Sequence, residues 1–137
     1  MVKFNSNLKK DKMKTKIETI KAPKAVGPYS QAIAVDNFIF TSGNIHLTPD
    51  GKLLEGSIEE RTHQVMKNLK AVLEKAGVTF ANVVKTTIYV INMGDYAKIN
   101  EVYSSYMSDP FPARETISVK ALPMGATLEI SMIAVKN

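Results

Sequence analysis

The sequence predicts a single α/β domain in which two helices cover one face of a mixed β-sheet. Apolar residues recur at helical spacing between residues 57 and 77, and again between residues 94 and 109. Residues 83–91 are β-branched and alternate in polarity, which is typical of a strand. Four further alternating stretches complete the order ββαβαββ, and 137 residues are enough for one such domain with its own core.

The first two strands are expected at residues 32–35 and 38–41. Asp36 and Asn37 join them, because both side chains tolerate the positive φ of a tight hairpin turn. The second strand leads into Ser42-Gly43-Asn44, where the glycine lets another group approach the backbone closely. We therefore expect some group of the fold, or a ligand, to lie directly against Gly43.

The first helix is expected to begin at Ser57, because a serine followed three residues later by Glu60 forms a capping box. Gly77 ends it. The second helix is expected to begin at Gly94-Asp95 and to end at Asp109-Pro110, since the residue before a proline avoids the helical conformation.

The last two strands are expected at residues 116–121 and 127–135. In the final strand, Leu128 and every second residue after it form one apolar face, but Ile133 and Val135 make the opposite face apolar as well. Two helices can cover only one face of such a sheet. A closed homo-oligomer that buries the second face is the simplest expectation.

The net charge of +5 belongs to the N-terminal end of the chain, because residues 1–24 hold 8 lysines against Asp11 and Glu18. We expect residues 1–16 to be a lysine-rich extension and residues 17–137 to be one domain. This distribution does not favour a nucleic-acid partner, which calls for a basic face with arginines and aromatic residues. No stretch is apolar and long enough to be a signal peptide or a membrane span, so a cytoplasmic protein without a membrane partner is expected.

Several kinds of chemistry lack the residues they need. The chain has no cysteine, and His46 and His63 are too few and too far apart in sequence to predict a metal site. The nucleotide-binding motifs G-x-G-x-x-G and G-x-x-x-x-G-K-[ST] are absent, as is the G-x-S-x-G motif of serine hydrolases.

Arg114 is one of two arginines, and it follows Pro110 and Pro112 at the expected start of a strand. In such a place a guanidinium can hold a carboxylate with two parallel hydrogen bonds. Glu129 lies in the middle of a strand that is otherwise almost free of charge, and burial raises the pKa of a carboxyl group while a nearby arginine lowers it. The two residues therefore suggest either a plain ion pair or an acid–base site, and the residues alone leave both open.

Five blocks of the sequence, in order, resemble the signature blocks of the YjgF-like reactive intermediate deaminases, in the RidA branch of that family. They are GPYSQA at residues 27–32, FTSGNI at 40–45, KTTIYV at 85–90, FPAR at 111–114 and LEI at 128–130. Three positions depart from the family pattern: Thr116 replaces a common cysteine, and Asn44 and His46 replace glutamine and proline.

The resemblance implies a chorismate-mutase-like fold, a homotrimer with sites between subunits, and no cofactor. It also implies hydrolysis of enamines and imines, such as 2-aminoacrylate and 2-iminobutyrate, to 2-oxo acids and ammonia. Arg114 would bind the substrate carboxylate, and Glu129 would hold the attacking water and move protons. The remaining site residues would line the pocket or, through the backbone, orient the imine: Tyr29, Ser42, Gly43, Asn100 and Thr116. The alternative is a non-catalytic module that binds 2-oxo acids in the same cleft.

Overall fold

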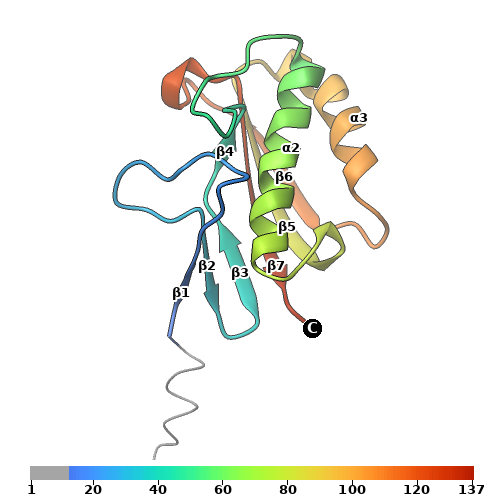
Figure 1. Ribbon diagram of the computed structural model, residues 1–137. Coiled ribbons are helices and arrows are strands. Elements are labelled where there is room, and N and C mark those ends of the chain that lie inside the picture. The colour runs from blue at the N-terminus through green and yellow to red at the C-terminus, as the bar shows by residue number, and fades with distance from the viewer. Residues whose placement is uncertain (1–12) are drawn as a thin grey trace, which may run out of the picture.

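The computed structural model describes residues 13–137 as one mixed α+β fold with seven strands and two α-helices (Figure 1). The helices are α2 (Ile58–Lys75) and α3 (Tyr96–Tyr106). The strands are β1 (Thr15–Ile17), β2 (Ala32–Val35), β3 (Phe38–Thr41), β4 (Asn44–Ile45), β5 (Val83–Val90), β6 (Ala113–Ser118) and β7 (Leu128–Val135). Most of the extension predicted at residues 1–16 lies outside the described residues, so that boundary stays a prediction.

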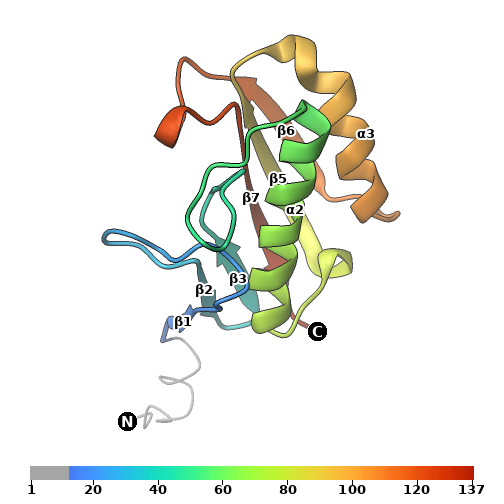
Figure 2. The same ribbon diagram turned by 45° about the horizontal axis from the view of Figure 1, so that its top comes forward.

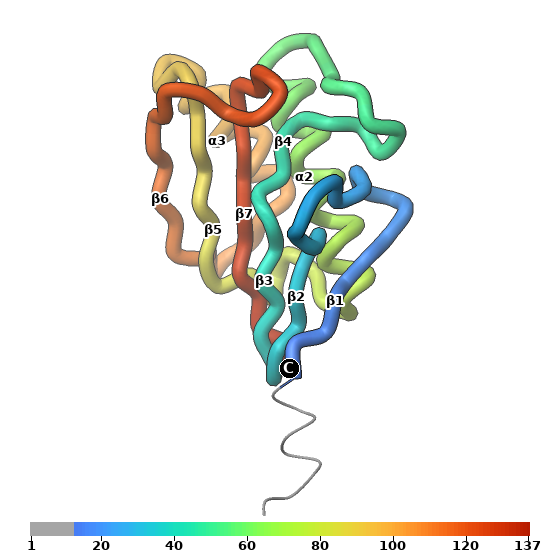
Figure 3. The backbone as a smooth tube through the Cα atoms, turned by 90° about the vertical axis from the view of Figure 1, so that its left-hand side faces the viewer, coloured from blue at the N-terminus to red at the C-terminus, as the bar shows by residue number. Residues whose placement is uncertain are grey.

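The sheet is mixed, as predicted, with the strand order β1-β2-β3-β7-β5-β6. Every pair is antiparallel except β5 and β6, which α3 connects as a parallel crossover. The short strand β4 pairs with β7 beyond the end of β3. Seen from its open side in Figure 3, the sheet runs in front of both helices.

Local sequence signals placed the hairpin and the first helix correctly. β2 and β3 have the predicted bounds, and Asp36 takes a φ of 50° in the turn between them. Ser57 and Glu60 form the predicted capping box, and Gly77 follows the helix with a φ of +83°. These features depend on neighbours within a few residues, which is why the sequence alone identifies them.

Two strands were not predicted, and α3 and β6 differ from the prediction at both ends, since α3 ends at Tyr106 and β6 ends at Ser118. β1 and β4 were missed because they are three and two residues long and show no alternation. The second helix begins at Tyr96, since Met93–Asp95 form a 3-10 turn that the Asn92 side chain caps. β6 begins at Ala113 instead of Thr116, because parallel pairing with β5 extends over residues that follow the prolines. Arg114 therefore lies within the edge strand.

The two faces of the sheet have different environments. Leu128, Ile130, Met132 and Ala134 are buried under α2 and α3, which lie on the same side of the sheet (Figure 2). On the other side Phe38, Phe40 and Ile117 are each more than 40% exposed. The apolar open face predicted from the alternation of β7 is therefore present, and its burial in an oligomer stays a prediction. None of the helices in residues 13–137 has the length and apolarity that a membrane crossing requires.

Candidate active site

The structure separates the predicted site residues into two groups. Four of them line one cleft: Tyr29, Ser42, Gly43 and Glu129. The other three belong to α3 and the edge strand β6: Asn100, Arg114 and Thr116. The chain therefore holds two partial sites.

Strand register places Arg114 and Glu129 on opposite faces of the sheet. Arg114 is level with Thr86 on β5, whose side chain is fully buried under the helices. Glu129 is level with Tyr89, which lies three residues after Thr86 on β5. Because side chains alternate along a strand, Tyr89 and Glu129 point to the opposite face. Among residues 13–137 the ion pairs are Lys16 with Glu18 and Lys85 with Glu115. The alternative of an Arg114–Glu129 ion pair within one chain is therefore wrong.

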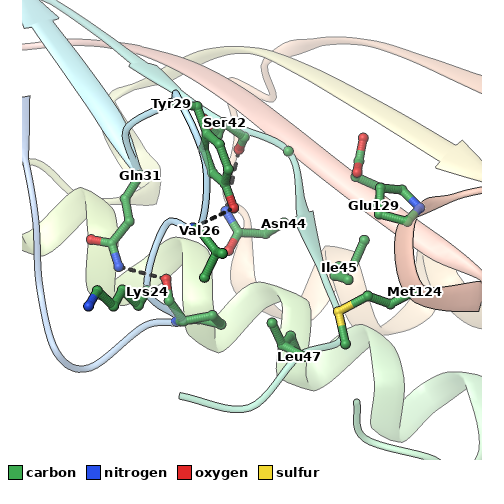
Figure 4. Close-up of a pocket in the computed structure, with 13 residues that line it drawn as sticks. Lys24, Val26, Tyr29, Gln31, Ser42, Asn44, Ile45, Leu47, Met124 and Glu129 are labelled. Carbon is green, nitrogen blue, oxygen red and sulfur yellow. Dashed lines mark hydrogen bonds between the residues drawn. The ribbon is translucent and has the colours of Figure 1, made fainter. Parts of the chain in front are cut away.

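The cleft around Glu129 has a volume of about 480 Å³ and is lined by segments from both ends of the chain (Figure 4). In Figure 4, Tyr29, Ser42 and Asn44 lie on one side, and Met124 and Glu129 lie on the other. Asn44, one of the departures from the family pattern, thus contributes directly to the cleft. His46 does not line it.

Glu129 lies directly against the backbone of Gly43, as the glycine led us to expect. A Cβ atom at residue 43 would be 2.6 Å from both Cδ and Oε2 of Glu129, which is closer than real Cβ atoms come to other groups. The pairing of β4 with β7 produces this approach, because it sets Ile45 opposite Glu129. Burial raises the pKa of the Glu129 carboxyl group above its usual value. A carboxyl group can accept and return a proton, and a raised pKa makes its carboxylate form a stronger base.

The Ser42 and Tyr29 hydroxyl groups have structural partners. Ser42 Oγ donates to the carbonyl of Ser30 at 2.6 Å, and Tyr29 Oη accepts from the backbone N–H of Val26 at 3.3 Å. The Ser42 proton is thus already used, which leaves this side chain as part of the wall. Gln31, which was not predicted as a site residue, also lines the cleft, and its amide bonds to the backbone of Thr19 and Pro23.

The Arg114 guanidinium is held by one stripe of α3. Its Nη1 donates to Oδ1 of Asn100 at 2.8 Å, and its Nη2 donates to the hydroxyl of Tyr96 at 2.6 Å. Its Cζ atom lies 5.0 Å from the ring centre of Tyr103 and 5.6 Å from that of Tyr96. Neither Tyr96 nor Tyr103 was predicted as a site residue. Their spacing from Asn100, four residues before it and three after it, was the available signal.

The backbone of Thr116 faces the open edge of the sheet. The N–H of Val119 bonds to the carbonyl of Val90 on β5. Because backbone N–H groups alternate in direction along a strand, that of Thr116 points away from β5. Among residues 13–137 no strand lies beyond β6, so this group is available to a ligand or to another chain.

His46 is fully buried and stabilises the region beside the cleft. Its Nε2 accepts the backbone N–H of Thr127 at 3.0 Å, so the ring proton is on Nδ1, which donates to the carbonyl of Leu54 at 2.8 Å. Burial lowers the pKa of this imidazole. His46 thus connects the loop after β4 to the start of β7, two residues before Glu129. Within residues 13–137, no group of three or more acidic or histidine side chains could hold a metal ion.

Comparisons with known proteins agree with the fold and with the blocks seen in the sequence. The 2-iminobutanoate/2-iminopropanoate deaminase of Mus musculus is 46% identical over 122 residues, which are 88% of this chain and 90% of the mouse protein. RidA from the Antarctic bacterium Psychrobacter sp. PAMC 21119 is 40% identical with a TM-score of 0.85, and the match covers 88% of this chain and 98% of that one. TdcF of E. coli, solved with bound serine, is 32% identical with a TM-score of 0.85 over 90% of this chain and 99% of its own.

The family described as endoribonuclease L-PSP matches residues 19–136, nearly all of the part of the chain that the structure describes. This span contains every one of the five sequence blocks and both partial sites. The chain therefore belongs to the endoribonuclease L-PSP family, which is the YjgF/RidA family that the sequence resembles.

Proposed function

We propose that this protein is a hydrolytic deaminase that converts reactive enamines and imines, such as 2-aminoacrylate and 2-iminobutyrate, to 2-oxo acids and ammonia. The names of the mouse and human relatives, at 46% and 44% identity, support this reaction class. The observation that carries the proposal is the division of the site into two halves. One half offers a guanidinium held by neutral groups, and the other offers a carboxyl group of raised pKa that forms no ion pair within residues 13–137.

A second copy of the chain completes the site. Arg114 and Glu129 of one chain cannot contact the same small molecule, because the sheet separates them. The open apolar face and the edge strand β6 are surfaces through which copies can associate. We propose a homotrimer of chorismate-mutase-like domains, in which Arg114 of one protomer faces Glu129 of its partner. Closed cyclic assembly would then form an identical cleft at each interface.

Arg114 binds the substrate carboxylate in this proposal. Two of its five N–H donors go to Asn100 and Tyr96, so three remain for a ligand. A planar carboxylate accepts two of them in parallel, which fixes both its position and its orientation. The serine bound to the related TdcF is an amino acid and therefore carries a carboxylate group. The backbone N–H of Thr116, on the same edge strand, would orient the imine group.

Glu129 performs the proton transfers. As a carboxylate it takes a proton from a water molecule while the water oxygen attacks the imine carbon. Glu129 then gives this proton to the imine nitrogen, and the product of the step is a tetrahedral carbinolamine. In the second step Glu129 takes the hydroxyl proton of the carbinolamine and gives it to the amino group as the C–N bond breaks, so that ammonia leaves, the 2-oxo acid forms and Glu129 is again a carboxylate. The balance is one imino acid and one water in, and one 2-oxo acid and one ammonia out.

An imine carbon is already electrophilic, so orientation and one general acid–base residue are sufficient for this reaction. The residues fit that requirement. The Ser42 hydroxyl is bonded to Ser30, and its place is in the wall of the cleft instead of in a proton relay. Tyr29 and Met124 are exposed at the cleft and would close it around the substrate side chain.

The test is a reaction in which threonine dehydratase releases 2-iminobutyrate. Added protein is expected to speed the release of 2-oxobutanoate in proportion to its concentration. Arg114→Ala is expected to abolish this effect, whereas Lys98→Ala, which removes an exposed cation from α3, is expected to retain it. Binding of 2-oxobutanoate without any acceleration would reject the enzyme and would favour the non-catalytic ligand-binding module.

A further inference from the structure

The Arg114 side chain is held at three points by α3, and each point is a neutral group. Asn100 accepts from Nη1, Tyr96 accepts from Nη2, and the Tyr103 ring packs against the guanidinium plane with 5.0 Å between Cζ and the ring centre. Tyr103 is buried and its own hydroxyl donates to Thr86 at 3.0 Å, so the ring is a fixed support.

Neutral partners leave the positive charge of Arg114 available. An aspartate or glutamate at the position of Tyr96 or Asn100 would neutralise the guanidinium and compete with a ligand carboxylate. A phenol and an amide instead accept one hydrogen bond each and keep the charge. The guanidinium is therefore oriented but not neutralised, which is the state that an anion receptor requires.

Tyr96 is the most exposed of these three supports, with 40% of its surface accessible. Its position is set by the 3-10 turn Met93–Asp95, in which Asn92 accepts the backbone N–H of Gly94 at 2.9 Å. A free arginine side chain loses considerable rotamer entropy when it binds a carboxylate. A hydrogen bond at Nη2 removes part of that freedom before the ligand arrives.

We propose that Tyr96 is a positioning residue, whose hydroxyl holds Arg114 in the orientation that receives a carboxylate. This inference rests on the proposed function, because it takes Arg114 to be the carboxylate-binding group. Tyr96 acts through Arg114 and does not itself contact the reacting atoms. Its effect is therefore confined to ligands with a carboxylate, and it falls mainly on binding instead of on the chemical step.

The test is Tyr96→Phe, which removes the hydroxyl and keeps the ring that packs beside Arg114. Tyr106→Phe is the matched control, since Tyr106 lies on the same helix and its hydroxyl bonds to His63 Nδ1 at 2.8 Å, away from Arg114. We expect Tyr96→Phe to raise KM for 2-iminobutyrate about 10-fold, with kcat within about twofold of the wild type. Tyr106→Phe should leave both constants within about twofold.

Direct binding separates this inference from the proposed function. The dissociation constant of 2-oxobutanoate should rise about 10-fold in Tyr96→Phe, whereas that of the neutral 2-oxobutanamide should be unchanged. If the variant loses affinity for both ligands equally, or for neither, Tyr96 is not a positioning residue for the carboxylate. If the wild type shows no turnover but the carboxylate-specific loss is present, the proposed function fails and the role of Tyr96 stands.

Discussion

Replacing Gly43 with alanine tests whether the Glu129 carboxyl group must lie where the structure places it. The new Cβ would be 2.6 Å from Cδ and Oε2 of Glu129 and 2.9 Å from its Cγ. Ordinary contact begins at 3.4 Å, so the carboxyl group has to withdraw by about 0.8 Å. The φ of residue 43 lies outside the left-handed region, and the alanine backbone is therefore not strained. The substitution acts on Glu129.

A displacement of this size has a large kinetic effect and a small effect on folding. Moving a catalytic group by roughly 1 Å lowers the rate of the chemical step by about 100-fold, so kcat should fall by about that factor. The end of the Glu129 side chain borders an open cleft and can withdraw into it. We therefore expect the free energy of unfolding to fall by about 1 kcal/mol, at the low end of the cost of an inserted methyl group.

The assay is the release of 2-oxobutanoate in the threonine dehydratase reaction, followed at saturating substrate so that kcat is measured. Gly56→Ala is the matched control, because its Cβ would meet the flexible end of Glu60 at 3.1 Å, away from the cleft. An unchanged kcat in Gly43→Ala, together with an inactive Glu129→Gln, would show that the contact with Gly43 does not set the catalytic position of Glu129. A fall in affinity for 2-oxobutanoate at constant kcat would show that the methyl group blocks the ligand instead.

Three further predictions concern the carboxyl group, the buried histidine and the open face. Glu129→Gln should lower kcat by about 100-fold or more. Because burial raises the pKa of Glu129, the free energy of unfolding of the wild type should decrease as pH rises above 4.5 through the folded-state pKa. Urea unfolding of Glu129→Gln should lack this pH-dependent loss. The pKa of His46 is lowered by burial, so stability should be full above pH 6.5 and fall as pH decreases toward its folded-state pKa, an effect that His46→Gln should remove. Ile133→Glu places a charge on the open apolar face next to Phe40 and should convert the proposed trimer into folded monomers, as measured by light scattering; an unchanged mass would reject this face as the interface.

Features that depend on near neighbours could be predicted from the sequence. The capping box at Ser57 and the two-residue turn at Asp36 are both formed by residues within three positions of each other. β4 could not be predicted, because its two residues are strand only through their pairing with β7. That pairing also brings Gly43 against Glu129, so the close contact at the centre of the candidate site depends on it.

The candidate site could likewise be predicted only in part, because some of its contacts join residues that are far apart in the sequence. Residues from both halves were predicted, but Tyr96 was not, because its helical spacing from Asn100 indicates a shared helix face and does not show that Arg114 packs on that face. His46 was considered as a metal ligand and as a departure from the family pattern, whereas its two ring hydrogen bonds reach segments 8 and 81 residues away in sequence. Contacts of this range leave no periodic signal in the sequence.

The sequence by itself determined the alternation of β7, which puts Glu129 on the face opposite the buried core, and it determined the family through five ordered blocks. Only the tertiary structure decided the side on which Arg114 lies. That side follows from the parallel register of β6 against β5, which aligns Arg114 with the buried Thr86. Side chains alternate with a period of two, so a shift of one residue in this register would have placed Arg114 on the face of Glu129. Register is a property of two strands that are brought together by folding, and no single stretch of the chain encodes it.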